Sequence, residues 1–455
     1  MRRFAVSLTL LLCSVAFAQS PPTPPQLSPQ SAYEQATRPL EITRRAIENW
    51  SDSETAALAV AIQQAKEQCS ARTPSQYTGE DLIAYARLCA LGQQWPTVQD
   101  AVTLYLHAQR TAKPPKTVAD FPGLPQAYAY LIDASLHLND PTVALVTALE
   151  MLETVPYTEI TSQATNETIR YLQLIQTSDA LSLLAQRQAV LLPLLRSSVT
   201  ANPAASQQPL PLHNLYADGI ALAALQQFAN QPETAAATLA ELNAALPPNL
   251  SPDDSILIAE TRRQYALLGT PLPDLAPSAY LLREPVTFVP RDEANFGAAS
   301  AFLLFPDWCS QCVRMGPQFT TALFRIGQYD VRFYALLAQA APLPPTAPAP
   351  AKTRPTSAKA TRFLPSSAAS AAAPDPSQAP PKTPAELLRG TPPLIVSNDI
   401  LTRFAVTDIP LLIVTDHKRI IRFLQPTTES VLTSGGLADQ VIVRVIEQWP
   451  GPSVK

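Results

Sequence analysis

Glycine and charged residues are both scarce in this sequence. Only 12 of the 455 residues are glycine, and neither a GxGxxG pattern nor a P-loop pattern is present, which argues against a glycine-rich nucleotide-binding loop. Charged residues make up 15% of the chain, well below the roughly 25% of an average soluble protein. The net charge is −4 and there is no long basic run, so we expect no nucleic acid among the partners.

Histidine is rare as well, and its positions do not suggest a metal site. The four histidines are far apart, without the short spacing of metal ligands, and a second Cys-x-x-Cys pair is absent. Structural zinc usually takes four ligands. We therefore expect no metal and no cofactor.

The N-terminus has the features of an export signal. Arg2-Arg3 precede an apolar run from Phe4 to Phe17, which is short for a membrane span, and Ala16-Phe17-Ala18 is a small-x-small cleavage site. We expect cleavage near Ala18, which removes residues 1–18 and leaves an exported protein, periplasmic in a cell with two membranes. The alternative is an uncleaved anchor.

Export affects how the cysteines are interpreted. Without the signal, four cysteines remain: Cys69, Cys89, Cys309 and Cys312. An even number in an oxidising compartment suggests pairing. A Cys69–Cys89 disulfide would close a loop of about twenty residues and stabilise the fold by roughly 3 kcal/mol. The alternative for this pair is two buried free thiols.

Composition divides the mature chain into segments. Residues 19–30 form a proline-rich spacer, and residues 31–270 have apolar residues at three- and four-residue steps, which predicts helices. A proline-rich linker at 271–285 leads to a C-terminal domain at 286–455. Within this domain, a Pro/Ala-rich insertion at 341–381 is predicted to be disordered.

A turn pattern recurs between the predicted helices. It is found at Gly92–Pro96, Asn139–Pro141 and Asn230–Pro232, and the prolines lie 45 and then 91 residues apart. This spacing predicts stacked α-helical hairpins. The region resembles a tetratricopeptide-like solenoid, which implies a concave surface for a protein partner. The alternative is a packing scaffold without a ligand.

The C-terminal domain contains the chemically most informative motif, Trp308-Cys309-Ser310-Gln311-Cys312. An apolar run at Ala301–Phe305 predicts a buried strand before it, and a helix is predicted from Cys309 to Gln328. Free N–H groups at a helix N-terminus stabilise a thiolate, which is the reactive form of cysteine. The motif therefore indicates a redox pair.

The rest of this domain alternates strands and helices. A first strand is possible at 286–289, further strands are predicted at 331–337, 411–415 and 420–424, and helices are predicted at 398–406 and 436–449. This order predicts an α/β domain with a sheet of mixed direction.

The order and four local features resemble the thioredoxin fold, in particular its exported thiol–disulfide oxidoreductases. The features are Trp308, the Cys309–Cys312 pair, Pro317 inside the helix, and Ile409-Pro410 before a strand. The resemblance implies that Cys309 is the nucleophile and Cys312 the resolving cysteine. It also implies that Trp308, Ile409 and a cis Pro410 bind the substrate.

Two positions depart from this family pattern. Leu303 stands where many thioredoxins have a buried aspartate, and Ser310-Gln311 replaces the usual residues between the cysteines. Because the two intervening residues tune the reduction potential, the redox direction cannot be predicted from the sequence.

The sequence is compatible with two functions. The first is an exported thiol–disulfide oxidoreductase that acts on protein thiols and disulfides, with a membrane redox donor if it is a reductase and a protein partner at the helical repeats. The second is a non-catalytic interaction protein with a degenerate thioredoxin-like module.

Overall fold

The computed structural model describes two connected parts, a helical region and a sheet domain. The described residues are 27–46, 52–112, 120–197, 210–275, 279–280, 297–309, 312, 331–339, 393–427 and 437–451. The predicted signal peptide, the possible strand at 286–289, Pro317 and the insertion at 341–381 lie outside these residues.

The helical region extends from Pro29 to Ala266. Its helices are α1 (Pro29–Ala46), α2 (Asp52–Ser70), α3 (Glu80–Leu91), α4 (Trp95–Thr111), α5 (Leu124–His137), α6 (Pro141–Thr154), α7 (Glu159–Ile175), α8 (Thr177–Arg196), α9 (Leu212–Phe228), α10 (Pro232–Ala244) and α11 (Pro252–Ala266), with a short 3-10 helix at Pro74–Gln76. The helical character predicted from the apolar spacing is thus confirmed for the described part of this region. None of the described helices is long and apolar enough to span a membrane.

The three predicted turns share one backbone geometry. Gln93, Asn139 and Asn230 each adopt a left-handed conformation, with φ values of 56°, 60° and 60°. In each turn the next residue donates its backbone N–H to the carbonyl five positions earlier, which closes the preceding helix. The side chain of Asp140 accepts a hydrogen bond from the N–H of Val143 and caps α6. The spacing of the prolines therefore marks a repeated helix–turn–helix unit.

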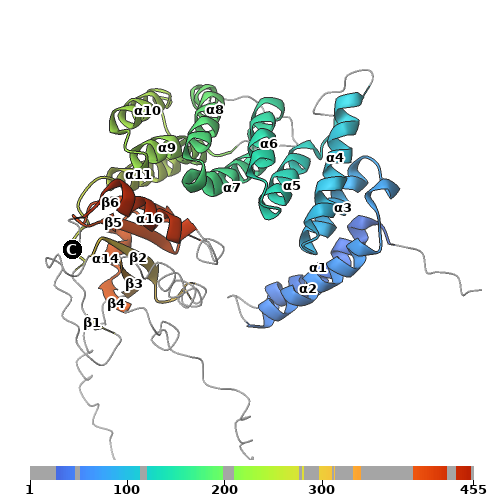
Figure 1. The fold of residues 1–455 in the computed structure, drawn as a ribbon, viewed down its shortest axis with the longest axis horizontal. Helices are drawn as coiled ribbons and strands as arrows, with labels where there is room; N and C mark the ends of the chain where they lie inside the picture. The colour runs from blue at the N-terminus through green and yellow to red at the C-terminus, as the bar shows by residue number, and fades with distance from the viewer. Residues whose placement is uncertain are drawn as a thin grey trace, which may run out of the picture.

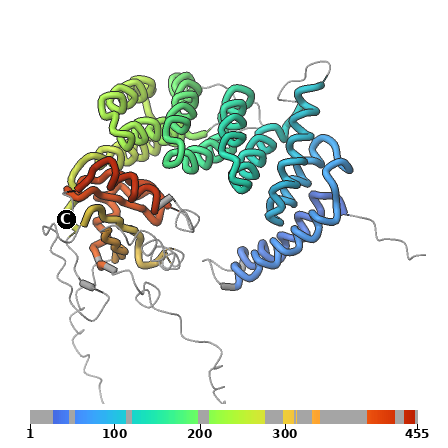
Figure 2. The backbone as a smooth tube through the Cα atoms, in the orientation of Figure 1, coloured from blue at the N-terminus to red at the C-terminus, as the bar shows by residue number. Residues whose placement is uncertain are grey.

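The helices form an arch (Figure 1). The first helices of successive hairpins pack side by side, with α3 between α1 and α5, and with α5 against α7. The chain runs from the α1–α2 end to the α9–α11 end, beneath which the sheet domain lies (Figure 2).

The sheet domain contains a six-stranded sheet in the order β1-β4-β3-β2-β5-β6. Strands β2, β3 and β4 are parallel, while β5 is antiparallel to both β2 and β6. The elements are β1 (Ala279–Tyr280), β2 (Ala299–Pro306), β3 (Val331–Gln339), β4 (Pro393–Ser397), α14 (Asp399–Arg403), β5 (Leu411–Asp416), β6 (Ile421–Pro426) and α16 (Leu437–Gln448). All eight residues of the central strand β2 are buried.

The predicted mixed sheet is confirmed, with two additional strands. The strands predicted at 301–305, 331–337, 411–415 and 420–424 correspond to β2, β3, β5 and β6. The sequence does not predict β4, which lies parallel beside β3. It also does not predict the short strand β1, which lies antiparallel to β4 within the predicted linker.

The two parts of the chain are in direct contact. Directly after α11, Gly269 donates its N–H to the carbonyl of Ile421, and Ile421 donates to Thr270. Residues 269–272 therefore lie along the β5–β6 hairpin. The ring of Phe228, at the end of α9, lies 5.8 Å from that of Phe423 and 6.4 Å from that of Trp449. Aromatic packing thus joins the arch to the sheet.

Candidate functional site

The central strand of the sheet leads directly to the cysteine pair. After β2, the N–H of Asp307 donates to the carbonyl of Ala338 at 3.0 Å, and the N–H of Cys309 donates to the carbonyl of Pro306 at 3.1 Å. The first bond ties the turn to the neighbouring strand β3. Because β2 is buried on both faces, the position of Cys309 at its end is well fixed.

Cys309 and Cys312 form a disulfide, with their Cα atoms 5.3 Å apart. Cys309 is half-buried, whereas Cys312 is only 1% exposed. The backbone N–H of Cys312 points at the Sγ atom of Cys309, at 3.2 Å. In the reduced pair, an N–H group in this position would favour a negative charge on that sulfur.

Trp308 precedes the pair and is strongly exposed. Its side chain is 72% accessible, which is unusual for the largest apolar side chain. An exposed aromatic ring beside a half-buried sulfur can contact an approaching molecule.

Ile409 and Pro410 lie at the same end of the sheet as the cysteines. Leu411, the first residue of β5, pairs with Leu304 near the end of the antiparallel strand β2. This register brings the segment before β5 close to the turn that carries Cys309. The Ile409–Pro410 peptide bond is cis, as the resemblance implies.

The interior beside the pair is apolar. Leu303 is fully buried and pairs with Leu412 and Ala335. The buried carboxylate of Asp416 is at the opposite end of the sheet, where it pairs with Arg422 at 2.8 Å. Asp416 therefore cannot serve in place of an aspartate at position 303.

Cys69 and Cys89 form a second disulfide, between α2 and α3. Both cysteines are buried, and the hydroxyl of Tyr85 donates to the carbonyls of Cys69 and Arg72 at 3.1 and 3.0 Å. Burial raises the pKa of Tyr85 to about 12, so this hydroxyl keeps its proton. This disulfide is in the helical region, apart from the Cys309–Cys312 pair.

The sequence did not indicate that Thr427 belongs to this site. Its backbone N–H donates to the carbonyl of Pro410 at 2.8 Å, just after β6 ends. Because any residue except proline can make this bond, only the strand register could have revealed it.

No group of three or more potential metal ligands is found among the described residues. The chain matches none of the models of known protein families, the curated proteins or the solved structures with which it was compared. Its function therefore has to be inferred from the site itself.

Proposed function

We propose that this protein is an exported thiol–disulfide oxidoreductase with a thioredoxin-like sheet domain. The observation that carries the proposal is the asymmetry of the pair: Cys309 is half-buried, and its partner Cys312 is 1% exposed. An accessible sulfur bonded to a protected one is the arrangement that thiol–disulfide exchange requires.

The chemistry needs only the two cysteines and a protein substrate. The Cys309 thiolate attacks one sulfur of a substrate disulfide, which breaks that bond and releases a substrate thiolate. The thiolate of Cys312 then attacks the Sγ atom of Cys309 and releases the second substrate thiolate. Two electrons pass from the pair to the substrate, leaving the pair as the observed disulfide. The reverse sequence would oxidise a substrate dithiol.

The surrounding residues support specific roles. Trp308 is exposed beside Cys309 and would contact the substrate. Ile409 and Pro410 would hold an extended substrate segment against the pair. The helical region would recruit a protein partner, and the N-terminal signal would deliver the protein to a compartment where disulfides form. In the reductase direction, a membrane dithiol donor would restore the reduced pair.

The decisive experiment combines a redox titration with substrate trapping. The mature protein is equilibrated with defined ratios of reduced to oxidised glutathione, and the state of each cysteine is read by alkylation and mass spectrometry. We expect Cys309 and Cys312 to titrate as one two-electron couple. A Cys312→Ala variant should accumulate mixed disulfides in extracts, whereas a Cys309→Ala variant should not. A pair that neither cycles nor traps a protein rules out the proposal.

One observation favours the second candidate, a non-catalytic interaction protein. Leu303 provides no proton acceptor within the sheet, although many thioredoxins have an aspartate there. An insulin-reduction assay with dithiothreitol separates the two candidates. The oxidoreductase should accelerate precipitation of the insulin B chain and lose this effect in Cys309→Ser. An interaction protein would leave the rate unchanged in both forms.

A further inference from the structure

A pocket lies where the helical region meets the sheet domain. Its volume is about 230 Å³, and its walls come from α7, α9, α11 and the end of β6. Junctions between two folded parts are frequent places for small-molecule sites. The pocket is distinct from the cysteine pair, since neither cysteine lines it.

The lining combines an apolar wall with hydrogen-bond donors. Ile169, Ile220 and Leu268 contribute apolar surface, and Arg170 is the only charged residue among the lining residues, which include no aspartate or glutamate. Arg170 bonds to Glu167 through one nitrogen, at 2.6 Å. A guanidinium has five N–H donors, so others remain available to a ligand.

Two buried amides in the lining have no acceptor. Gln173 is 2% exposed, and its Nε2 atom has no hydrogen-bond partner among the described residues. The Nε2 atom of Gln264 is also buried without a hydrogen-bond partner among the described residues. Both glutamines line the pocket. Buried donors without acceptors cost free energy, which a ligand oxygen can recover.

We propose that this pocket binds a small molecule with an apolar body and a carboxylate. The carboxylate accepts hydrogen bonds from Arg170 and from the glutamine amides, while the body packs on the aliphatic wall. A charge-assisted bond to a guanidinium is among the stronger polar contacts available to such a ligand.

Hexanoate is a suitable probe because it has the proposed chemistry and is small enough for the pocket. We expect ligand-observed NMR and calorimetry on the full mature chain to detect hexanoate binding. Acetate, which lacks the apolar body, and hexan-1-ol, which lacks the carboxylate, should each bind at least about tenfold more weakly. The proposal would be overturned if hexanoate and hexan-1-ol bound equally well. It would also be overturned if hexanoate did not bind at all, as expected if only water fills the pocket.

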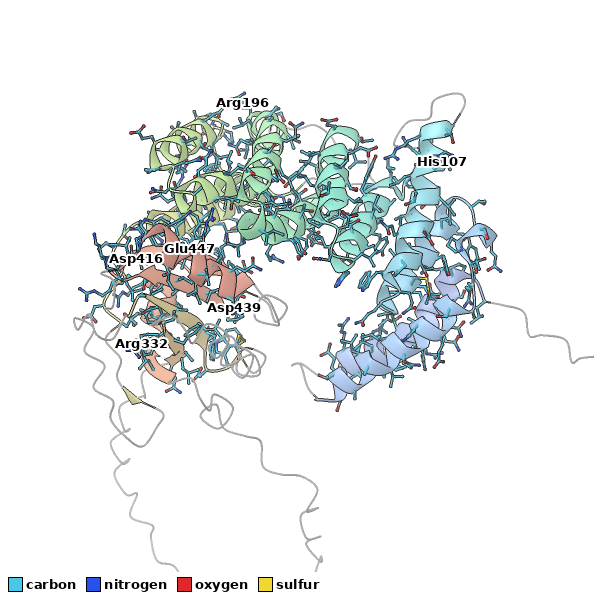
Figure 3. All side chains as sticks on the ribbon, viewed as in Figure 1. His107, Arg196, Arg332, Asp416, Asp439 and Glu447 are labelled. Carbon is cyan, nitrogen blue, oxygen red and sulfur yellow. A yellow bond between two sulfur atoms is a disulfide. The ribbon has the colours of Figure 1, made fainter. Side chains whose placement is uncertain are left out.

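Variants locate the binding. Arg170→Gln should weaken hexanoate binding by about tenfold, whereas Arg196→Gln should leave it unchanged, because Arg196 lies on the outer side of the arch (Figure 3). Ala221→Leu and Ala224→Leu add volume to the lining and should reduce binding further. Both alanines are half-buried, so the larger side chains can be accommodated, and circular dichroism with thermal melting verifies that each variant folds. Folded variants that retain full hexanoate affinity would disprove the site.

Discussion

The backbone N–H of Thr427 donates a 2.8 Å hydrogen bond to the carbonyl of Pro410. This bond links the end of β6 to the segment before β5 that lies beside the cysteine pair. It fixes one side of the candidate site without using a side chain.

Removing this donor should disturb the site. Thr427→Pro has no backbone N–H, so we expect a loss of about 0.5–1.5 kcal/mol in the free energy of unfolding. We also expect slower formation of mixed disulfides on Cys309. Thr427→Ser keeps the N–H and is the matched control. Urea denaturation and a trapping time course on the Cys312→Ala background measure both effects, and equal behaviour of the two variants would contradict this role.

The helical region contains a buried charge pair that should matter for stability. Arg187 is fully buried, and its Nη1 atom lies 3.7 Å from the Oδ1 atom of the Asp218 carboxylate. Arg187 also donates to the side-chain oxygen of Asn166 at 2.5 Å and to the backbone carbonyl of Asp218 at 2.7 Å. The carboxylate of Asp218 also accepts hydrogen bonds from Tyr157 and Ser162, at 2.8 and 2.6 Å. These contacts connect α7, α8 and α9.

Breaking this network on one side leaves a buried charge without its partner. We expect Arg187→Met to lower the free energy of unfolding by about 3–5 kcal/mol. The double variant Arg187→Met/Asp218→Asn should lose less free energy of unfolding than the two single variants lose together, because both substitutions remove the same interaction. A double-mutant cycle in urea tests this, and simple additivity would show that the two residues act independently.

The left-handed turns predict a stabilising substitution. Gln93 is exposed and has a φ of 56°, a conformation that costs a residue with a Cβ roughly 1–2 kcal/mol. Glycine avoids this cost but loses more conformational entropy on folding. The net effect of Gln93→Gly should be an increase of about 0.5–1 kcal/mol in the free energy of unfolding. Asn230→Gly is the comparison, with a smaller gain because asparagine adopts this conformation more readily. Melting curves that rank the two variants in the opposite order would contradict the explanation.

Acid should weaken the contact between α9 and α11. Burial by itself raises the pKa of Asp254, but hydrogen bonds from Ser251 and His213 outweigh it, so that the pKa is lowered in the folded protein. A lowered folded-state pKa contributes stability above the unfolded value of about 3.9, and this contribution is lost as the pH falls through the folded value.

The corresponding variant is Asp254→Asn. This substitution should lower the free energy of unfolding by about 1–2 kcal/mol at pH 7. It should also flatten the dependence of stability on pH below about 4. Asp253→Asn, at the exposed neighbouring position, should change neither. Denaturation midpoints between pH 7 and pH 3 measure the difference, and an unchanged pH profile in Asp254→Asn would assign the acid sensitivity to other groups.

The sequence predicts much of the sheet domain because its strands are distinct apolar runs. The run at 301–305 is bounded by a turn and by the cysteine motif, so β2 could be located within two residues. The sequence does not reveal β4 because the strand begins at a proline, Pro393, and contains only a short apolar run. Its pairing with β3 depends on contacts that no local pattern encodes.

The candidate site was predictable in its residue types but not in its surroundings. Cys309, Cys312 and Ile409-Pro410 are recognisable from motifs. The contact between Thr427 and Pro410 depends on the register of β5 against β6, and the packing of Phe228 on Phe423 joins residues far apart in the chain. Such relationships arise from tertiary packing, which spacing and composition do not specify.

The stretch of chain after α11 determines where this protein can be divided. Gly269 and Thr270 exchange hydrogen bonds with Ile421, so a cut at this point would strip backbone partners from the hairpin that contains β5 and β6. A gene fragment that begins after Thr270 would therefore encode a sheet with an exposed edge, prone to pairing with other chains. Recombination that moves the cysteine pair to another protein should preserve the sheet only if it also carries residues 269–272.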